Sequence, residues 1–216
     1  MNKTLENLLN KDNCFFIHYA SDGFYNEAFS APRVSCIVIF NDKTKEKGKF
    51  CIADYIQENS VEQSEKLLLL KFKKFLEERP NVSFIHWNMN SQGFGFNAIQ
   101  ARAKEFCIEI PMIPKENLFD LSSYVEYLGG KKLSIKQVLW FNYFLDECFL
   151  DGKTEAEYFK KEKFDDILAS VHSKVVGLSC IVEEIKKDSL ITEKSSATQH
   201  DLTKEDKRKL ALEIAI

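Results

Sequence analysis

Carboxylates and one histidine at separate places in the chain are the residues that could do chemistry. Carboxylate oxygens are preferred ligands of Mg²⁺ and Mn²⁺, and histidine exchanges a proton near neutral pH, so this set suits metal-dependent hydrolysis. The catalytic candidates are Asp22, Asp120, Asp165, Asp166 and His172. Two-metal hydrolysis needs several carboxylates around ions that lie about 4 Å apart. If these carboxylates converge in a nuclease, we expect Mg²⁺ or Mn²⁺ as its cofactor. The sequence indicates no other cofactor with certainty. It also does not assign the metal ligands.

Two histidines and an asparagine could instead form a polar binding site at one end of a sheet. His86 and Asn88 alternate in the apolar run 82–88, so in a strand their side chains share a face. We expect His18 on the adjacent strand, with Asp22 beside it, and α/β sheets often bind ligands at strand ends. The alternative is that these residues hydrogen-bond neighbouring loops, because buried polar groups need partners in any protein.

The loop after the first expected strand begins with an acidic residue and continues with aromatic ones. Asp22 either supplies a carboxylate to a site or stabilises a turn through its own side chain. Phe24 and Tyr25 either stack on the bases of a nucleic acid or pack within the loop. We therefore treat Phe24 and Tyr25 as binding candidates.

The composition limits the class of protein and its compartment. The 216 residues carry a net charge of −3 and are 44% hydrophobic, which indicates one buried core and argues against a strong, sequence-independent nucleic-acid binder. The six cysteines lack C-x-x-C spacing, which is typical of reduced thiols in an intracellular protein. The first residues do not resemble a signal peptide, and no apolar run reaches membrane-spanning length. We expect a cytoplasmic protein with no membrane partner.

Hydrophobic patterns predict an α/β fold with a mixed sheet flanked by helices. Apolar runs at both parities predict strands that are covered on both faces, and apolar residues at 3–4 spacing predict helices that pack on them. The expected strands are residues 14–20, 34–40, 49–56 and 82–88. The expected helices are 60–79, 94–107 and 121–128, followed by a helix capped by Ser134 and by a last long helical region that begins at Thr154 and carries an apolar stripe from Phe164. Ser60, Ser134 and Thr154 each precede Gln or Glu by three residues, which is a capping-box pattern.

Three short segments and the order of the elements resemble a known family. The segments are HWNM (86–89), GFGF (93–96) and FDL (119–121). The first two are similar to the motif His-Asn-x-x-Phe-Asp of DEDD-type 3′–5′ exonucleases, and the third is similar to the Asp-Thr-Leu stretch between that family's motifs. Three meander strands, a helix, a fourth strand and then helices only also resemble the ribonuclease H-like domain of these enzymes. The resemblance covers about residues 14–188.

The chain departs from this family at the residues that carry its chemistry. The family's first strand has an Asp-x-Glu pair that faces the metal ions, and this chain has His18 and Ala20 there. The last expected helix offers Asp165, Asp166 and His172, but not in the family's His-then-Asp order. A histidine and an alanine cannot supply the carboxylate that bridges two metal ions. The resemblance therefore implies a degenerate ribonuclease H-like domain.

We expect this domain to act as a binding or regulatory module for nucleic acid or for a partner protein. It is also similar to uncharacterised bacterial proteins, some of which belong to mobile defence islands, so the resemblance implies a role in bacterial defence. One alternative is a divergent metal-dependent nuclease that uses Asp22, Asp120 and Asp165 or Asp166. Another is a subunit of a multi-protein assembly that docks through its C-terminal tail. Whether the protein is an enzyme stays open.

The C-terminal region has a different composition from the rest of the chain. We divide the chain into a domain of residues 1–188, a polar linker of 189–202 and a docking helix of 203–216. The last segment carries Leu210 and Ile214, and a short isolated helix is marginal in water without packing. We expect it to be buried against its own domain, a second copy in a homo-oligomer, or a partner protein.

Overall fold

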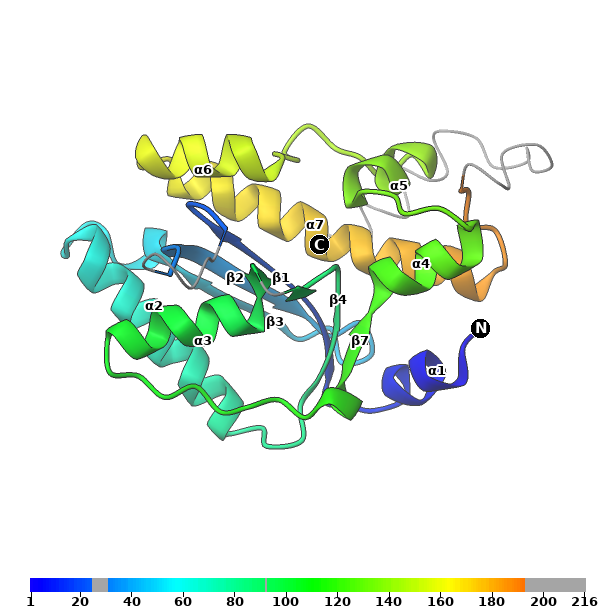
Figure 1. The fold of residues 1–216 in the computed structure, drawn as a ribbon, viewed down its shortest axis with the longest axis horizontal. Coiled ribbons are helices and arrows are strands. Elements are labelled where there is room, and N and C mark those ends of the chain that lie inside the picture. The colour runs from blue at the N-terminus through cyan, green and yellow to red at the C-terminus, as the bar shows by residue number, and fades with distance from the viewer. Residues whose placement is uncertain (25–30, 92, 193–216) are drawn as a thin grey trace.

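The computed structural model describes residues 1–24, 31–91 and 93–192, which form an α/β fold. Within them, seven α-helices flank a five-stranded mixed sheet (Figure 1). The sheet strands are β1 (Cys14–Ser21), β2 (Val34–Phe40), β3 (Lys47–Cys51), β4 (Ser83–His86) and β7 (Leu118–Asp120). A separate hairpin is formed by β5 (Asn90–Ser91) and β6 (Phe94–Gly95). The helices are α1 (Lys3–Leu9), α2 (Val61–Glu77), α3 (Phe96–Glu105), α4 (Leu121–Gly129), α5 (Ile135–Phe141), α6 (Gly152–Lys160) and α7 (Phe164–Lys186).

The sheet has the order β3-β2-β1-β4-β7, so β1 is its central strand. Strands β1, β2 and β3 are antiparallel neighbours, whereas β4 and β7 run parallel to β1. The register pairs Phe16 with Phe40 across β1 and β2, and Ile17 with His86 across β1 and β4. Every residue of β1 and β2 is buried, as their apolar residues at both parities predict. The expected mixed sheet is therefore confirmed.

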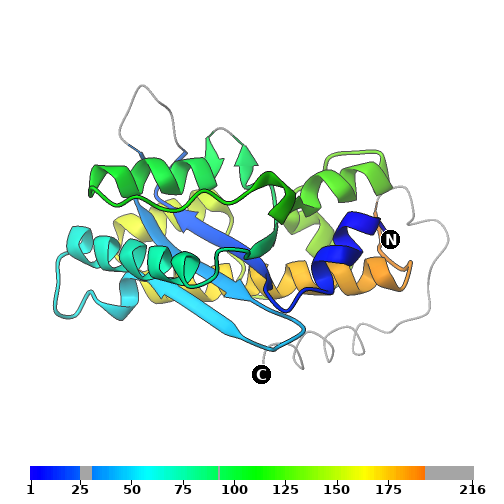
Figure 2. The same ribbon diagram turned by 90° about the horizontal axis from the view of Figure 1, so that it is seen from below.

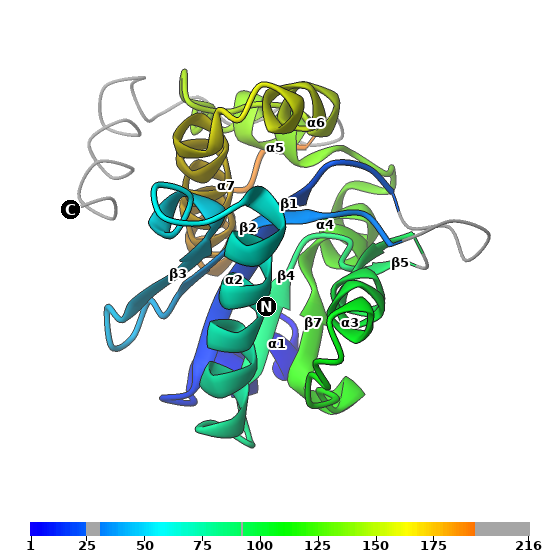
Figure 3. The same ribbon diagram turned by 90° about the vertical axis from the view of Figure 1, so that its left-hand side faces the viewer.

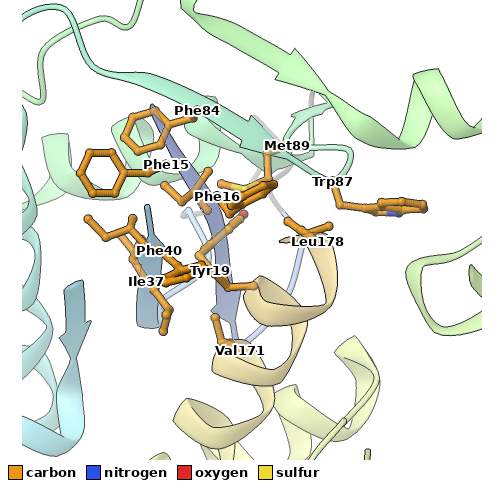
Figure 4. Packing of buried hydrophobic residues seen from close by; sticks show 14 of the residues in the cluster. Phe15, Phe16, Tyr19, Ile37, Phe40, Phe84, Trp87, Met89, Val171 and Leu178 are labelled. Atoms are coloured by element: carbon orange, nitrogen blue, oxygen red, sulfur yellow. The ribbon is translucent and has the colours of Figure 1, made fainter. Parts of the chain in front are cut away.

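Helices cover both faces of the sheet (Figure 3). Helix α7 packs along β1 and β2 with α6 beside it, and Figure 4 shows Val171 and Leu178 of α7 among the buried side chains of these strands. Helices α2 and α3 cover the opposite face, where Phe15 of β1 meets Phe75 of α2 edge to face at 5.4 Å between ring centroids. Helix α1 lies near α4 (Figure 2), and Asn2 N–H donates to Tyr124 Oη at 3.0 Å. Helices thus cover both faces of the central strand.

Two capping residues act as the sequence predicts, and a third does not. Ser60 accepts a hydrogen bond from Gln63 N–H, and Ser134 forms a complete capping box with Gln137. Helix α6 instead begins after Asp151, whose carboxylate accepts the backbone N–H of Thr154 at 2.9 Å. The expected helix start at Thr154 is therefore wrong, because the aspartate three residues earlier is an equally good cap.

Several strand boundaries also differ from the sequence expectations. Strand β3 ends at Cys51 and continues as a 3₁₀ helix over Ile52–Asp54, and β4 ends at His86. The β5–β6 hairpin occupies the expected start of α3. The expectation that only helices follow the fourth strand is wrong, because Leu118–Asp120 form β7 beside β4. Three residues are too few to show a period in the sequence.

Two residues close the base of the segment 25–30, which lies outside the described residues. Arg33 donates its backbone N–H to Asp22 Oδ1 and its Nε–H to Asp22 Oδ2, both at 2.7 Å. Asp22 N–H donates in return to the carbonyl of Arg33 at 3.0 Å. The turn-stabilising interpretation of Asp22 therefore has direct support.

Two further carboxylates bind backbone N–H groups shortly after residues 25–30. Val34 N–H donates to Glu65 of α2 at 2.7 Å, and Ala31 N–H donates to Glu105 of α3 at 2.8 Å. Glu65 is fully buried, and Arg102 binds both its oxygens at 2.9 and 2.6 Å while also pairing with Glu105. We call Asp22, Glu65 and Glu105 the carboxylate clamp.

The C-terminal expectations fall mostly outside the described residues. Residues 193–216 are not described, so the rest of the linker and the docking helix stay predictions. The first linker residues are held, because Asn142 Oδ1 accepts Ile191 N–H at 2.8 Å and its Nδ2 donates to Ile191 O at 3.0 Å. None of the helices in the described part of the chain is long and apolar enough to cross a membrane.

Candidate functional site

A buried ion pair lies between α6 and α7, next to the central strand. Lys174 Nζ lies 2.6 Å from Glu155 Oε1, and Ser170 Oγ donates to the same oxygen at 2.7 Å. Lys174 and Glu155 are 3% and 4% exposed. Burial raises the pKa of Glu155, and Lys174 opposes this rise. We call these three residues the buried polar centre; each ion in it depends on the other, because an unpaired charge at this depth is strongly destabilising.

His18 of β1 lies close enough to the buried polar centre to be influenced by its charge. Burial first, and then the ammonium of Lys174, hold the pKa of His18 well below its ordinary value, so its imidazole is neutral. Its Nδ1 atom has no hydrogen-bond partner among the described residues. A neutral imidazole can ligate metals, but a neighbouring ammonium disfavours a second cation. This environment of His18 is typical of a packed core and not of a metal site.

His86 occupies the end of β4 and interacts with β7. Its Nδ1 accepts Met89 N–H at 3.2 Å and lies 3.9 Å from Asp120 Oδ1. Burial lowers the pKa of His86 to about 4, although Asp120 acts in the opposite direction. Because Ile17 is the partner of His86 across the two strands, His18 points to the opposite face of the sheet. The expectation of adjacent strands is thus confirmed, but the two imidazoles do not share a face.

Asn88 lies beyond the strand that was expected to carry it. Its φ of 53° is left-handed, and its backbone N–H donates to Asp120 Oδ1 at 2.9 Å. The expectation that Asn88 shares a strand face with His86 is therefore wrong, because β4 has already ended. Asp120 also caps α4 by accepting Ser122 N–H at 3.0 Å, and it accepts Ser123 Oγ–H at 3.0 Å. These hydrogen bonds engage both carboxylate oxygens of Asp120 in local structure.

The remaining catalytic candidates lie on α7. Asp165 and Asp166 are exposed in its first turn, and Asp166 Oδ2 lies 3.9 Å from Lys163 Nζ. His172 is half-buried about two turns further along the helix and lines a groove with Lys47 and Asp165. Burial lowers its pKa. Asp165, Asp166 and His172 therefore do not share an environment with Asp120.

The carboxylates do not gather into a metal centre. Among residues 1–24, 31–91 and 93–192, which include all five catalytic candidates, no three His, Cys, Asp or Glu side chains could together hold a metal ion. Asp22 is paired with Arg33 in the clamp, and Asp120 caps a helix. The convergence that two-metal hydrolysis requires is therefore missing from the described residues.

Aromatic side chains cover the second half of β1, which β4 is too short to reach. Phe94 of the hairpin stacks on Tyr19 with ring centroids 4.4 Å apart, and Gly95 N–H donates to Tyr19 Oη at 2.9 Å. Phe24 is 79% exposed and lies edge-on to Phe94 at 6.2 Å. Gly95 has φ 117°, and a Cβ atom there would lie 1.6 Å from Met89 O, so the hairpin requires glycine. Tyr25 lies outside the described residues.

A second group of exposed aromatic residues lies on α4, α5 and the turn that follows α5, at one end of the molecule (Figure 1). Four of the large apolar side chains that are exposed in the described residues belong to this stretch. Three lysines are also exposed within it. We call this set the α4–α5 surface; its members are Tyr127, Leu128, Lys131, Lys132, Lys136, Trp140 and Tyr143.

The sequence also contained a signal for the buried polar centre and for the α4–α5 surface, neither of which contains a catalytic candidate. The middle of the helix over 164–186 carries apolar residues on most sides, so a lysine there, Lys174, is expected to be buried and to need an anionic partner. Trp140 stands on the polar side of a short capped helix, three residues after Gln137. An aromatic residue in that position indicates a contact surface.

Acidification is expected to destabilise the protein through His18 and His86. Both pKa values are lowered in the folded protein, to about 4 for His86, so below pH 6.5 the unfolded chain binds protons that the folded chain does not. The free energy of unfolding should fall by about 1.4 kcal/mol per pH unit for each histidine between pH 6.5 and the folded pKa. Urea denaturation at pH 7, 6 and 5 measures this slope.

The matched control for this slope is the half-buried His172. His86→Gln should make the slope shallower by about one histidine's contribution, and His172→Gln should change it less. An unchanged slope in His86→Gln would show that this imidazole takes up its proton while the protein is folded.

The sequence was also compared with known proteins. No protein-family model matches the chain, and no curated protein matches it significantly. The site must therefore be interpreted from its own geometry.

Proposed function

We propose that this chain is a ribonuclease H-like domain that binds single-stranded nucleic acid without cleaving it. The fold part of the proposal is supported by the sheet, in which a meander of three antiparallel strands is followed by two strands parallel to the first. A sheet of this kind is what the resemblance to the exonuclease domains implies. Fold alone does not imply an activity, so the two other parts of the proposal need their own arguments.

The absence of cleavage is supported by the residues at the centre of the sheet. His18 and Ala20 stand where the family has its first carboxylate pair, and both are buried. The ammonium of Lys174 influences His18 and is paired with Glu155, so the charge that a metal ion would bring is already supplied by a side chain. Bringing a divalent cation next to that ammonium would be unfavourable in a poorly solvated interior. The residues at the centre of the sheet are therefore suited to a structural role and not to two-metal hydrolysis.

Binding is supported by one observation, the α4–α5 surface. Trp140 is 63% exposed and Tyr127 is 81% exposed, and such rings can stack on unpaired bases. Lys131, Lys132 and Lys136 stand between them in the sequence and can contact phosphates. Aromatic rings interleaved with lysines are typical of single-strand binding surfaces. The charge is local, so it is compatible with a net charge of −3 for the whole chain.

Tryptophan fluorescence tests this proposal directly. The chain has two tryptophans, and Trp87 is only 6% exposed, so quenching by an oligonucleotide would report on Trp140. We expect oligo(dT) or oligo(U) to quench the emission, and Trp140→Ala to weaken affinity about 5- to 150-fold, which corresponds to about 1–3 kcal/mol for one stacked base. Three phosphate contacts should give a slope of log affinity against log salt of about −2.

Leu70→Ala is the matched control, because Leu70 is also an exposed apolar residue but lies on α2. It should bind as the unaltered protein does. The proposal fails if neither DNA nor RNA single strands bind at low salt, or if Trp140→Ala binds with full affinity. In the first case the same aromatic surface would be assigned to a protein partner.

The bound oligonucleotide should remain full length with Mg²⁺ or Mn²⁺ present. If it is digested, and if Asp22→Asn or Asp120→Asn abolishes the digestion, the divergent-nuclease alternative replaces the non-cleaving one. Binding and cleavage are measured on one sample, so each part of the proposal can fail separately.

A further inference from the structure

Two of the four buried cysteines lie directly opposite each other in the sheet. Cys36 of β2 is paired in register with Cys51 of β3, and both are fully buried free thiols. Directly opposite residues of antiparallel strands have Cα atoms about 4.5–5.5 Å apart and side chains on the same face. A disulfide needs Cα atoms about 4.4–6.8 Å apart, so the backbone already has the spacing that a bond between these two sulfur atoms requires.

The two thiols also interact with each other. A hydrogen bond with Cys36 lowers the pKa of Cys51, although burial acts in the opposite direction. The pKa of Cys36 is raised, first by burial and then by the same hydrogen bond. The thiolate is the reactive form of cysteine. Cys51 is therefore the thiol that ionises and reacts more readily, and Cys36 is placed to react with it in a second step.

The other two buried cysteines are in different situations. Cys14 of β1 lies opposite Ser83 of β4 and not opposite a cysteine. Burial raises the pKa of Cys14, and that of Cys180 on α7, to about 12. Such thiols carry almost no negative charge at neutral pH and behave as small apolar core residues. Register and thiol contact thus distinguish the pair Cys36 and Cys51 from cysteines that only fill space.

Both thiols are closed to solvent, so an oxidant must reach them when β3 separates from β2. Strand β3 is the terminal strand beside β2, and its five residues end at Cys51. Local opening of one short strand can occur at a lower free energy than global unfolding. When β3 pairs again, the register returns Cys51 to its position opposite Cys36. We propose that Cys36 and Cys51 form an oxidation site, at which a peroxide joins β2 to β3 through a reversible disulfide.

The oxidation takes place in two steps. The Cys51 thiolate attacks one peroxide oxygen, the O–O bond breaks, and the departing hydroxide takes up a proton to become water, which leaves a sulfenic acid on Cys51. The Cys36 sulfur then attacks the Cys51 sulfur, the S–O bond breaks, and the hydroxide leaves as water with the proton of the Cys36 thiol. Two thiols and one peroxide thus give one disulfide and two waters. This inference is separate from the nucleic-acid proposal, because it involves none of the residues of the α4–α5 surface.

Oxidation of the full-length protein with hydrogen peroxide tests the inference, in a Cys107→Ser/Cys148→Ser background that removes the two exposed thiols. We expect one disulfide, which peptide mapping by mass spectrometry assigns to Cys36 and Cys51 and which lowers the mass by about 2 Da. Dithiothreitol should restore both thiols. Cys14 is the matched internal control, because it is also buried in a strand of the same sheet. It should react more than about tenfold slower than Cys51, since its pKa is higher.

Two alanine variants in the same background separate the steps. In Cys36→Ala, Cys51 should stop at the sulfenic acid, which dimedone traps, and in Cys51→Ala, Cys36 should keep its thiol. Oxidation of Cys14 as fast as Cys51, or no disulfide while circular dichroism shows a folded protein, would overturn the proposal. A further measurement does not depend on the alanine variants: the disulfide should slow hydrogen exchange of the β3 amides, and equal exchange in oxidised and reduced protein would contradict a bond between the strands.

Discussion

Replacing Lys174 by methionine is expected to lower the free energy of unfolding by about 3–5 kcal/mol, because Glu155 would be left buried without its partner. Glu155 is 4% exposed, and Lys174 and Ser170 donate to it. Methionine conserves most of the lysine volume, so the effect reports on charge and not on a cavity. Urea denaturation at pH 7 gives the free energy.

The double variant Lys174→Met/Glu155→Leu separates the two possible causes. It removes both charges, and it should recover most of the lost stability, because apolar replacements of a buried pair are often neutral or stabilising. Lys186→Met is the control, since Lys186 forms an exposed pair with Glu183 that contributes at most about 1 kcal/mol. A single variant as stable as the original protein would mean that Glu155 takes up a proton or gains access to water when Lys174 is lost.

Replacing Arg102 by methionine is expected to cost a similar amount, about 3–5 kcal/mol. Arg102 is the cation that compensates the fully buried Glu65, through two hydrogen bonds at 2.9 and 2.6 Å. Its loss should also loosen the chain at Val34, whose N–H donates to Glu65. Chemical denaturation measures the first effect, and hydrogen exchange of the Val34 amide measures the second.

Arg79→Met provides the comparison for Arg102. Arg79 pairs with Glu46 on the surface at 2.8 Å, so its loss should cost at most about 1 kcal/mol. Arg102→Met/Glu65→Gln should restore part of the stability, since a neutral amide tolerates burial better than a carboxylate. Equal effects in Arg79→Met and Arg102→Met would contradict the assignment of Glu65 as a buried, compensated charge.

The fold could be predicted largely because its long elements carry strong local signals. Val34–Phe40 has the bounds that its apolar run predicts, and α7 begins at Phe164, where its stripe begins. Short elements carry no such signal. Strand β7 has three residues and is defined by its pairing with β4, which is a contact between distant parts of the chain. Such contacts leave no local period to detect.

The candidate site was harder to predict because the same residue types also serve local structure. Asp120 is a helix cap, and Asp22 forms a turn with Arg33, so neither is available for a metal centre. Spacing in the sequence cannot distinguish a capping aspartate from a catalytic one. Lys174 was missed for the opposite reason, since lysine is rarely buried and only the apolar surroundings of its helix indicate that it is.

The carboxylate clamp fixes the chain beside residues 25–30 through residues that lie outside that segment. Asp22, which precedes that segment, and Glu65 and Glu105, on α2 and α3, accept the backbone N–H groups of Arg33, Val34 and Ala31, which follow it. Backbone donors do not depend on which side chains the segment carries. A change at Glu65 or Glu105, on α2 and α3, is therefore expected to loosen the chain at Val34 or at Ala31.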